Sequence, residues 1–299
     1  MAFRDVMGSG TFVVTAELGP PLDPVADPVR RAAAALAQVV DAANVTDNQA
    51  ATVKVAPLAS AVWMLEQGLE PILQVTTRDR NVLALQSELL GAWALGVPNV
   101  LALSGDPLKV GRYGEVSRHV SEFDSLGLVR LIKQMNVGQL AAGETLSVPT
   151  GFLVASAINP LVDTREKVAA KRAAGSDFFQ TNIVYDTGRF AGWFGPLVES
   201  GVLEDAPVLV GVMPPRSVAA LEHMHRNIPG VEVNEETFAR LKGQSGADAK
   251  AAGVAVAADV IKQLRELPGV SGVHIMAPGW EVEAVTRVTE AAGLRDRRQ

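Results

Sequence analysis

The sequence contains no cysteine, which excludes disulfides, thiolate nucleophiles and metal or iron–sulfur centres held by cysteine. Redox chemistry in this protein would therefore need a bound cofactor. No apolar run approaches the roughly 18 uninterrupted residues of a membrane-spanning helix. The N-terminal segment MAFRDVMGSG lacks the basic region and long apolar stretch of a secretory signal. A cytoplasmic protein without membrane contact is the expectation.

Basic residues and histidine are also scarce. The 27 lysines and arginines are outnumbered by 33 acidic residues, which gives a net charge of −6. Such a balance argues against general nucleic-acid binding, although it is compatible with an anionic small molecule in a local basic pocket. The four histidines are scattered and no pair has the spacing of a known metal motif, so we expect no metal. His274 lies in an apolar run, where a hydrogen-bonded core role is expected.

What the sequence does contain is a repeated alternation of strand and helix, which residues 74–107 show most fully. Apolar residues at helical spacing within 82–93 separate two β-prone runs, 71–76 and 99–103. Each run ends in an abruptly polar segment. The pattern predicts two parallel strands joined by one helix, with their polar ends side by side.

The rest of the chain repeats this unit. Strands are predicted at 11–17, 43–46, 71–76, 99–103, 151–157, 178–184, 207–213 and 271–276. Helices are predicted at 28–40, 58–67, 82–93, 124–135, 164–174 (ending at Gly175), 188–199 and 281–292, with two or three more within 216–267 and a polar loop at 109–121.

Eight such units, with no boundary rich in Gly, Pro or Ser, favour a single-domain (β/α)8 barrel over residues 1–299. The alternative is an open doubly wound sheet. That fold usually carries a glycine-rich phosphate loop after its first strand, whereas here the first strand ends in Glu-Leu-Gly-Pro-Pro.

Polar residues stand at the carboxyl ends of the predicted strands, which meet at one mouth in such a barrel. They are Glu17, Thr46, Asp47, Gln74, Thr76, Asp106, Asn159, Gln180 and Asn182. Taken singly, each has a simpler interpretation: Asp106 after Gly105 could close a turn, and Glu17 could be a solvated carboxylate. Together they predict a functional site.

Several motifs also occur in a recognisable order. They are AELGPP (16–21), RDRN (78–81), LSGDP (103–107), KRAAG (171–175), QTN (180–182), YD (185–186), PP (214–215) and HIM (274–276). In these motifs the chain resembles the methylenetetrahydrofolate reductase family, and most of all its short acetogen-type branch, over essentially its whole length. The resemblance implies a (β/α)8 barrel with FAD at its mouth. It also implies reduction of 5,10-methylenetetrahydrofolate to 5-methyltetrahydrofolate, and the electron donor stays open between NADH or NADPH and a redox partner protein.

The resemblance assigns roles to individual residues. Glu17 matches the family's general acid, which protonates N10 so that the five-membered ring opens to an N5 iminium ion. Asp106 matches the aspartate between flavin and pterin, where a carboxylate stabilises that cation. Asn182 occupies the place of a folate-binding glutamine, with Gln180 two residues earlier on the same strand face. The implied cofactor-binding positions are Thr46, Gln74, Thr76, Ser104, Gly105, Asp106, Asn159 and Lys171.

Three of these positions differ from many relatives: Gln74 replaces His, Ser104 replaces Arg, and Asn159 replaces Tyr. The differences motivate a second hypothesis, a flavin-independent folate reductase that takes hydride directly from NAD(P)H. A third is a non-catalytic subunit that carries folate or electrons for a redox partner protein in a larger complex. A homo-oligomer is compatible with each of them.

Overall fold

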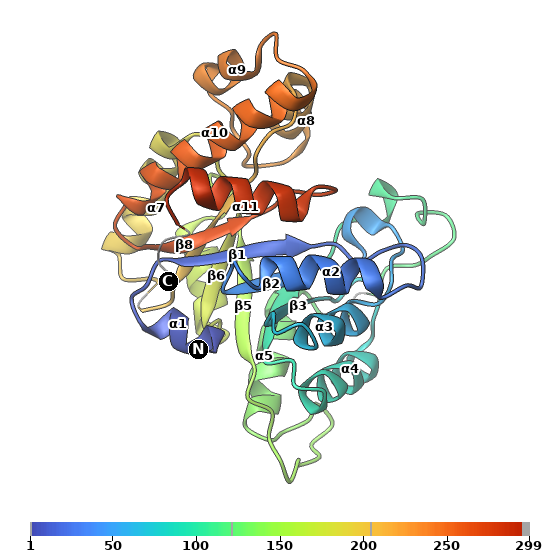
Figure 1. The fold of residues 1–299 in the computed structure, drawn as a ribbon. Coiled ribbons are helices and arrows are strands. Elements are labelled where there is room, and N and C mark those ends of the chain that lie inside the picture. Colours follow the sequence, from blue (N-terminus) through green and yellow to red (C-terminus); the bar gives the residue numbers. More distant parts are fainter. Residues whose placement is uncertain (1, 121, 204, 295–299) are drawn as a thin grey trace.

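Eight parallel strands close into a barrel in sequence order, and the first strand pairs with the last (Figure 1). The strands are β1 (Val13–Leu18), β2 (Ala42–Val45), β3 (Pro71–Thr76), β4 (Asn99–Leu103), β5 (Leu153–Ile158), β6 (Phe178–Ile183), β7 (Val208–Val212) and β8 (Val270–Ile275). This closed order confirms the (β/α)8 barrel and excludes the open sheet. The computed structural model describes residues 2–120, 122–203 and 205–294. Residue 121, which ends the predicted polar loop, and both ends of the predicted 1–299 domain lie outside the described residues.

Helices alternate with the strands around the outside of the barrel (Figure 1). They are α2 (Asp27–Leu36), α3 (Pro57–Leu65), α4 (Val82–Ala94), α5 (Ser125–Asn136), α6 (Arg165–Ala173), α7 (Thr187–Glu199) and α11 (Glu281–Ala291), with short 3-10 turns η1 (Gln49–Ala51) and η2 (Leu108–Val110). The extra helices expected between the seventh and eighth strands are α8 (Val218–Asn227), α9 (Glu235–Leu241) and α10 (Gly246–Arg265). In the described part of the chain, no helix combines the length and apolar character needed to span a membrane.

Two local features differ from the expectation. Helix α2 ends at Leu36 rather than at residue 40, because the N–H groups of Val39 and Val40 both bond to the Leu36 carbonyl in a tight turn. Both valines are buried, so the apolar pattern continues past the end of the helix. A further helix, α1 (Phe3–Gly8), was not predicted, since six residues are too few to show helical periodicity. Its Phe3 is fully buried and packs edge-on against Phe178, which closes the N-terminal end of the barrel interior.

Helices that follow the strand ends begin with capping side chains. Asn81, Asp124, Thr164 and Asp186 each accept a hydrogen bond from the backbone N–H three residues further along, in α4, α5, α6 and α7 respectively. Such caps satisfy helical N–H groups that would otherwise lack a partner. Part of the polar sequence after each strand therefore serves to start the next helix.

The barrel interior changes from apolar to polar along its axis. Near the N-terminal end, one cluster gathers Phe3, Val13, Ala42, Ile72, Leu101, Ala155, Phe178 and Leu209. Side chains two residues apart on a strand point to the same side of the sheet. Two positions beyond this cluster, β1, β2, β3 and β6 carry Thr15, Asn44, Gln74 and Gln180, and β8 adds His274, whereas β4, β5 and β7 carry Leu103, Ala157 and Gly211. A polar layer thus lies directly under the mouth.

Candidate active site

A cavity of about 580 Å³ opens at the carboxyl ends of the strands. It gathers most of the residues predicted from the sequence: Glu17, Asp47, Gln74, Thr76, Ser104, Gly105, Asp106, Asn159, Lys171, Gln180 and Asn182 all line it. Thr46 is buried beside them but does not line the cavity. The cavity also includes Asn44, Gln49 and His274, which the sequence analysis did not assign to the site. For Asn44, strand alternation was the available signal, since it lies two residues before Thr46.

Glu17, at the end of β1, has only 7% of its surface exposed. Gln49 Nε2 donates a long hydrogen bond of 3.4 Å to its Oε1, and His274 Nε2 lies 4.0 Å from its Oε2. On the other side of the ring, His274 Nδ1 is 3.0 Å from the Thr15 hydroxyl. His274 is thus the hydrogen-bonded core residue that was expected, but it also faces the carboxyl group of Glu17.

The buried side chain of Asp47 connects several groups at the mouth of the barrel. Its buried carboxylate accepts hydrogen bonds from the Thr76 N–H (2.9 Å), the Thr76 hydroxyl (2.8 Å) and Arg80 Nη1 (2.7 Å). Arg80 also pairs with Glu88. Burial by itself lowers the pKa of Arg80, but Asp47 and Glu88 outweigh it and raise the pKa above its ordinary value. The hydrogen bonds from Thr76 and Arg80 fix the orientation of the Asp47 carboxylate, and the carboxylate in turn fixes the Thr76 hydroxyl.

Asp106 lies at the exposed rim and is tied to the loop after β2. Its Oδ2 accepts a hydrogen bond of 2.7 Å from the Ala50 N–H, while the buried Arg78 donates from Nη1 to the Asp106 carbonyl at 3.0 Å. Asn48 and Ala50 have positive φ angles of 45° and 53°. This conformation is costly for residues other than glycine and persists only where surrounding contacts enforce it. The bond to Asp106 is one such contact.

Gly105 needs its own conformation. Its φ is +86°, and an added Cβ would lie 3.0 Å from Arg78 Cβ and 3.1 Å from Thr76 Cβ. A glycine is required there because L side chains rarely adopt this φ and the neighbouring strand leaves little space. The turn after β4 is thereby held against β3, which places Asp106 over the cavity.

Lys171 and Asn159 occupy the β5 side of the mouth. Lys171 Nζ donates to the Ala157 carbonyl at 2.7 Å and to Asp163 Oδ2 at 2.8 Å. Its charge is therefore already compensated by a carboxylate. Asn159 Oδ1 is buried and has no hydrogen-bond partner within the described residues. That oxygen lies against Gly230. Gln74, on the β3 side, makes no side-chain hydrogen bond in the described part of the chain, so its amide can serve a ligand.

Two amides meet across the polar layer. Asn44 Nδ2 donates to Gln180 Oε1 at 2.7 Å, and Gln180 Nε2 donates to Asn44 Oδ1 at 3.1 Å. Asn182, two residues further along β6, accepts a hydrogen bond from the neighbouring Ile183 N–H. Of the two predicted folate-binding residues, Gln180 therefore has its orientation fixed by another side chain, and Asn182 by backbone.

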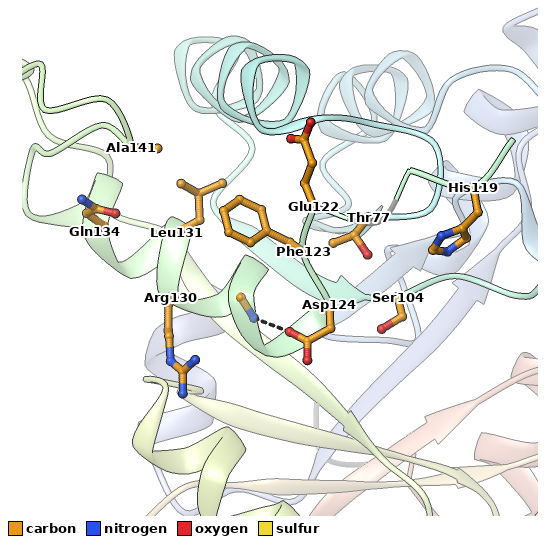
Figure 2. A pocket seen from close by; sticks show the side chains of 11 residues that line it. Thr77, Ser104, His119, Glu122, Phe123, Asp124, Arg130, Leu131, Gln134 and Ala141 are labelled. Carbon is orange, nitrogen blue, oxygen red and sulfur yellow. Dashed lines mark hydrogen bonds between the residues drawn. The ribbon is translucent and has the colours of Figure 1, made fainter.

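A second cavity of about 780 Å³ adjoins the first between the strand ends and α5 (Figure 2). Ser104 lines both cavities, and its hydroxyl accepts from the Ser125 N–H at 3.2 Å. In Figure 2 the Asp124 carboxylate accepts a hydrogen bond from the Gly127 N–H in the first turn of α5. Thr77 Oγ1 is buried at the cavity wall, without a partner in the described part of the chain.

The fit of a dinucleotide such as FAD can be judged from these features. The two adjoining cavities have the volume, and the unpartnered Thr77 hydroxyl and the Gln74 amide line them. The cavities offer few basic side chains for the diphosphate. Of the lysines and arginines in the described residues, only Lys171 and Arg130 line the cavities, and Lys171 is paired with Asp163. The residues present therefore fit the heterocycles better than the phosphates.

The fold and the site together define the class of protein. A (β/α)8 barrel in which carboxylates and amides converge at the carboxyl ends of the strands has the layout of barrel enzymes that act on small molecules. The particular family follows from sequence comparison. The chain belongs to the methylenetetrahydrofolate reductase family, whose model matches residues 2–293.

One curated relative agrees with this assignment, and two solved structures share the fold. The chain is 26% identical over 156 residues to methylenetetrahydrofolate reductase 2 of Saccharomyces cerevisiae, a match that spans 51% of this chain and 25% of the yeast protein. Among solved structures, a Clostridium thermocellum protein described as binding two copies of 5-methyl-5,6,7,8-tetrahydrofolic acid superimposes with a TM-score of 0.70 at 12% identity, covering 99% of this chain and all of that one. An F420-dependent secondary alcohol dehydrogenase has a TM-score of 0.58 at 10% identity over 94% of this chain and 99% of its own, which is a likeness of fold.

Proposed function

We propose that this protein reduces 5,10-methylenetetrahydrofolate to 5-methyltetrahydrofolate, with Glu17 as the general acid. One observation carries the proposal: Glu17 and Asp106, from β1 and the turn after β4, line the same cavity at the barrel mouth. The family assignment supports it, as does the methyltetrahydrofolate bound by the C. thermocellum relative.

The first task of the site is to open the bridged five-membered ring of the folate. Opening requires a proton at N10, and Glu17 is the carboxyl group placed to give it. Within the described residues the Glu17 carboxyl makes no ion pair with a lysine or arginine, and its neighbours are Gln49 and His274. His274, whose Nδ1 is bonded to Thr15, faces the Glu17 carboxyl with its Nε2 at 4.0 Å.

The second task is to stabilise the cationic N5 iminium ion that results. Asp106 is exposed at the rim and supplies a carboxylate for this purpose. The Ala50 N–H and the backbone contacts of Arg78 fix the turn that carries it. Asn182 and Gln180 contribute polar contacts for the folate ring from β6.

A bound flavin, FAD in this family, would supply the hydride and be reduced in turn by NADH or NADPH. We propose that Gln74, Thr76, Ser104, Gly105 and Asn159 hold its ring system and that Lys171 meets its phosphates. For Lys171 this requires exchanging Asp163 for the phosphate. Thr46, which lies behind the cavity wall, would support the cofactor side of the mouth.

A second candidate function dispenses with the flavin and transfers hydride from the nicotinamide directly to the folate. The pairing of Lys171 with Asp163 favours it, because few free cations are left to retain a resident diphosphate. A nicotinamide cosubstrate must leave after each turnover, so weak phosphate contacts suit it better.

The absorbance spectrum of the purified protein separates the two. A retained flavin gives a yellow protein whose visible absorbance bleaches with NADH or NADPH and returns with methylenetetrahydrofolate. A colourless protein that converts NADH and methylenetetrahydrofolate without added flavin supports direct transfer. If single-turnover mixing yields no 5-methyltetrahydrofolate with either donor, with or without FAD, the reductase proposal is wrong and a folate- or electron-carrying subunit becomes the better hypothesis.

A further inference from the structure

The reciprocal amide pair of Asn44 and Gln180 crosses the interior of the barrel. Asn44 is on β2 and Gln180 on β6, which are opposite strands in the closed order of eight. The two hydrogen bonds, 2.7 and 3.1 Å long, join side chains that are 1% and 3% exposed. The pair therefore forms the floor of the mouth cavity, which both residues line.

Packing alone gives no reason for two amides at this place. The interior layer beneath them is apolar, and a buried amide pair loses its hydration for hydrogen bonds of modest net value. Each amide also has hydrogen-bonding groups that the pair does not use. A side-chain amide has two N–H donors and two acceptor lone pairs. Within the pair, each residue uses one donor and one lone pair. Neither side chain makes another hydrogen bond within the described residues, so the unspent groups remain for a ligand.

The pair also lies beside the proposed acid. In the register of β1 and β2, Glu17 is the direct neighbour of Asn44. A folate that presents N10 to Glu17 therefore brings its pterin ring close to the amide pair. The pyrimidinone edge of a pterin carries an alternating set of donors and acceptors, which is the complement of what a fixed pair of carboxamides offers.

We propose that Asn44 and Gln180 form one recognition unit for the pterin ring, in which Gln180 contacts the ring and Asn44 is the positioning residue that fixes the Gln180 carboxamide. This inference rests on the proposed folate-reductase function. The nicotinamide carboxamide presents similar hydrogen-bonding groups, so the test compares both ligands.

The experiment measures Kd for 5-methyltetrahydrofolate and for NADH with purified wild-type protein and variants. Asn44→Leu keeps the approximate volume and removes the amide. We expect it to weaken 5-methyltetrahydrofolate binding about 10- to 100-fold, the range for losing buried hydrogen bonds, and to change NADH binding less than about 2-fold. Gln180→Met should weaken folate binding to a similar extent and serves if Asn44→Leu does not fold.

Asn99→Leu is the matched control. Asn99 is a buried amide on β4 that donates to Glu70 Oε1 and the Pro71 carbonyl, away from the cavity. Its loss should lower the melting temperature without changing the folate Kd. The exchange Asn44→Gln with Gln180→Asn conserves the total side-chain length of the pair, and we expect it to recover at least part of the folate affinity that either single change removes.

Three outcomes would overturn the inference. They are folate binding unchanged in a folded Asn44→Leu or Gln180→Met protein, weakening confined to NADH, and equal weakening of folate binding by Asn99→Leu. A wild-type protein that does not bind 5-methyltetrahydrofolate would overturn the proposed function itself, and the recognition unit with it. The wild-type titration therefore distinguishes failure of the inference from failure of the function.

Discussion

Replacing Glu17 by Gln tests most directly whether Glu17 acts in the reduction of the folate and not in the step with the nicotinamide. Glutamine has nearly the same shape but cannot deliver a proton to N10. Loss of a general acid typically costs about 100-fold or more in the step it serves. We therefore expect folate reduction in Glu17→Gln to slow by about 100-fold or more, while reduction of a bound flavin by the nicotinamide, or NADH binding in a flavin-free enzyme, continues as in the wild type.

The structure also predicts that this change leaves the fold intact. The nearest partners of Glu17 are the 3.4 Å contact from Gln49 and His274 at 4.0 Å, so no strong bond is removed. The free energy of unfolding should change by less than about 1 kcal/mol. A rate defect measured in this variant would then report on chemistry.

The assay is stopped-flow mixing of donor-loaded protein with methylenetetrahydrofolate, followed by chemical denaturation of the same samples. Glu70→Gln is the control, because Glu70 is a part-buried carboxylate that accepts from the Phe3 N–H and Asn99 Nδ2 and does not line the mouth cavity. A Glu17→Gln protein that reduces folate as fast as wild type would refute the role of Glu17 as acid. An equal slowing of Glu70→Gln would show that the effect is not specific to the site.

Three further predictions concern carboxylates around the mouth. Asp106→Asn should keep the fold yet slow folate reduction by roughly 10- to 1000-fold, the range for losing one electrostatic stabiliser. The donor step should change little. Wild-type rates in both steps would show that Asp106 serves only the turn. Asp163→Asn removes the carboxylate that occupies Lys171, so dinucleotide binding in a fluorescence titration should tighten severalfold, whereas unchanged binding would mean that Lys171 does not reach the phosphates. The hydrogen bond from Arg78 holds the pKa of Asp79 below its ordinary 3.8, so this group stabilises the fold above about pH 4 and the contribution is lost as the pH falls. Denaturation at pH 3 to 7 should therefore show a shallower acid loss in Asp79→Asn than in wild type, and identical slopes would contradict the assignment.

Much of the fold was determined by local sequence patterns. The switch between helical and strand periodicity sets the order of the elements, and that order closes the barrel. Capping residues such as Asp124 and Thr164 mark where helices begin. Apolar patterns misplace a helix boundary where a buried turn continues the pattern, as after Leu36. The six-residue α1 was missed because it is shorter than two helical turns.

The sequence also placed polar residues at the mouth, because all parallel strands of a barrel end on one face. It could not say how those residues are partnered. The bond of Asp47 to Arg80 joins two loops 33 residues apart, a separation that no periodicity encodes.

The pair of Asn44 and Gln180 shows the limit clearly. Asn44 and Gln180 are 136 residues apart, and each alone reads as an ordinary polar strand residue. Closure of the barrel brings β2 opposite β6, and only then do two short side chains reach one another across the interior. Strand alternation determined which way each side chain points, and the tertiary structure decided which one it meets.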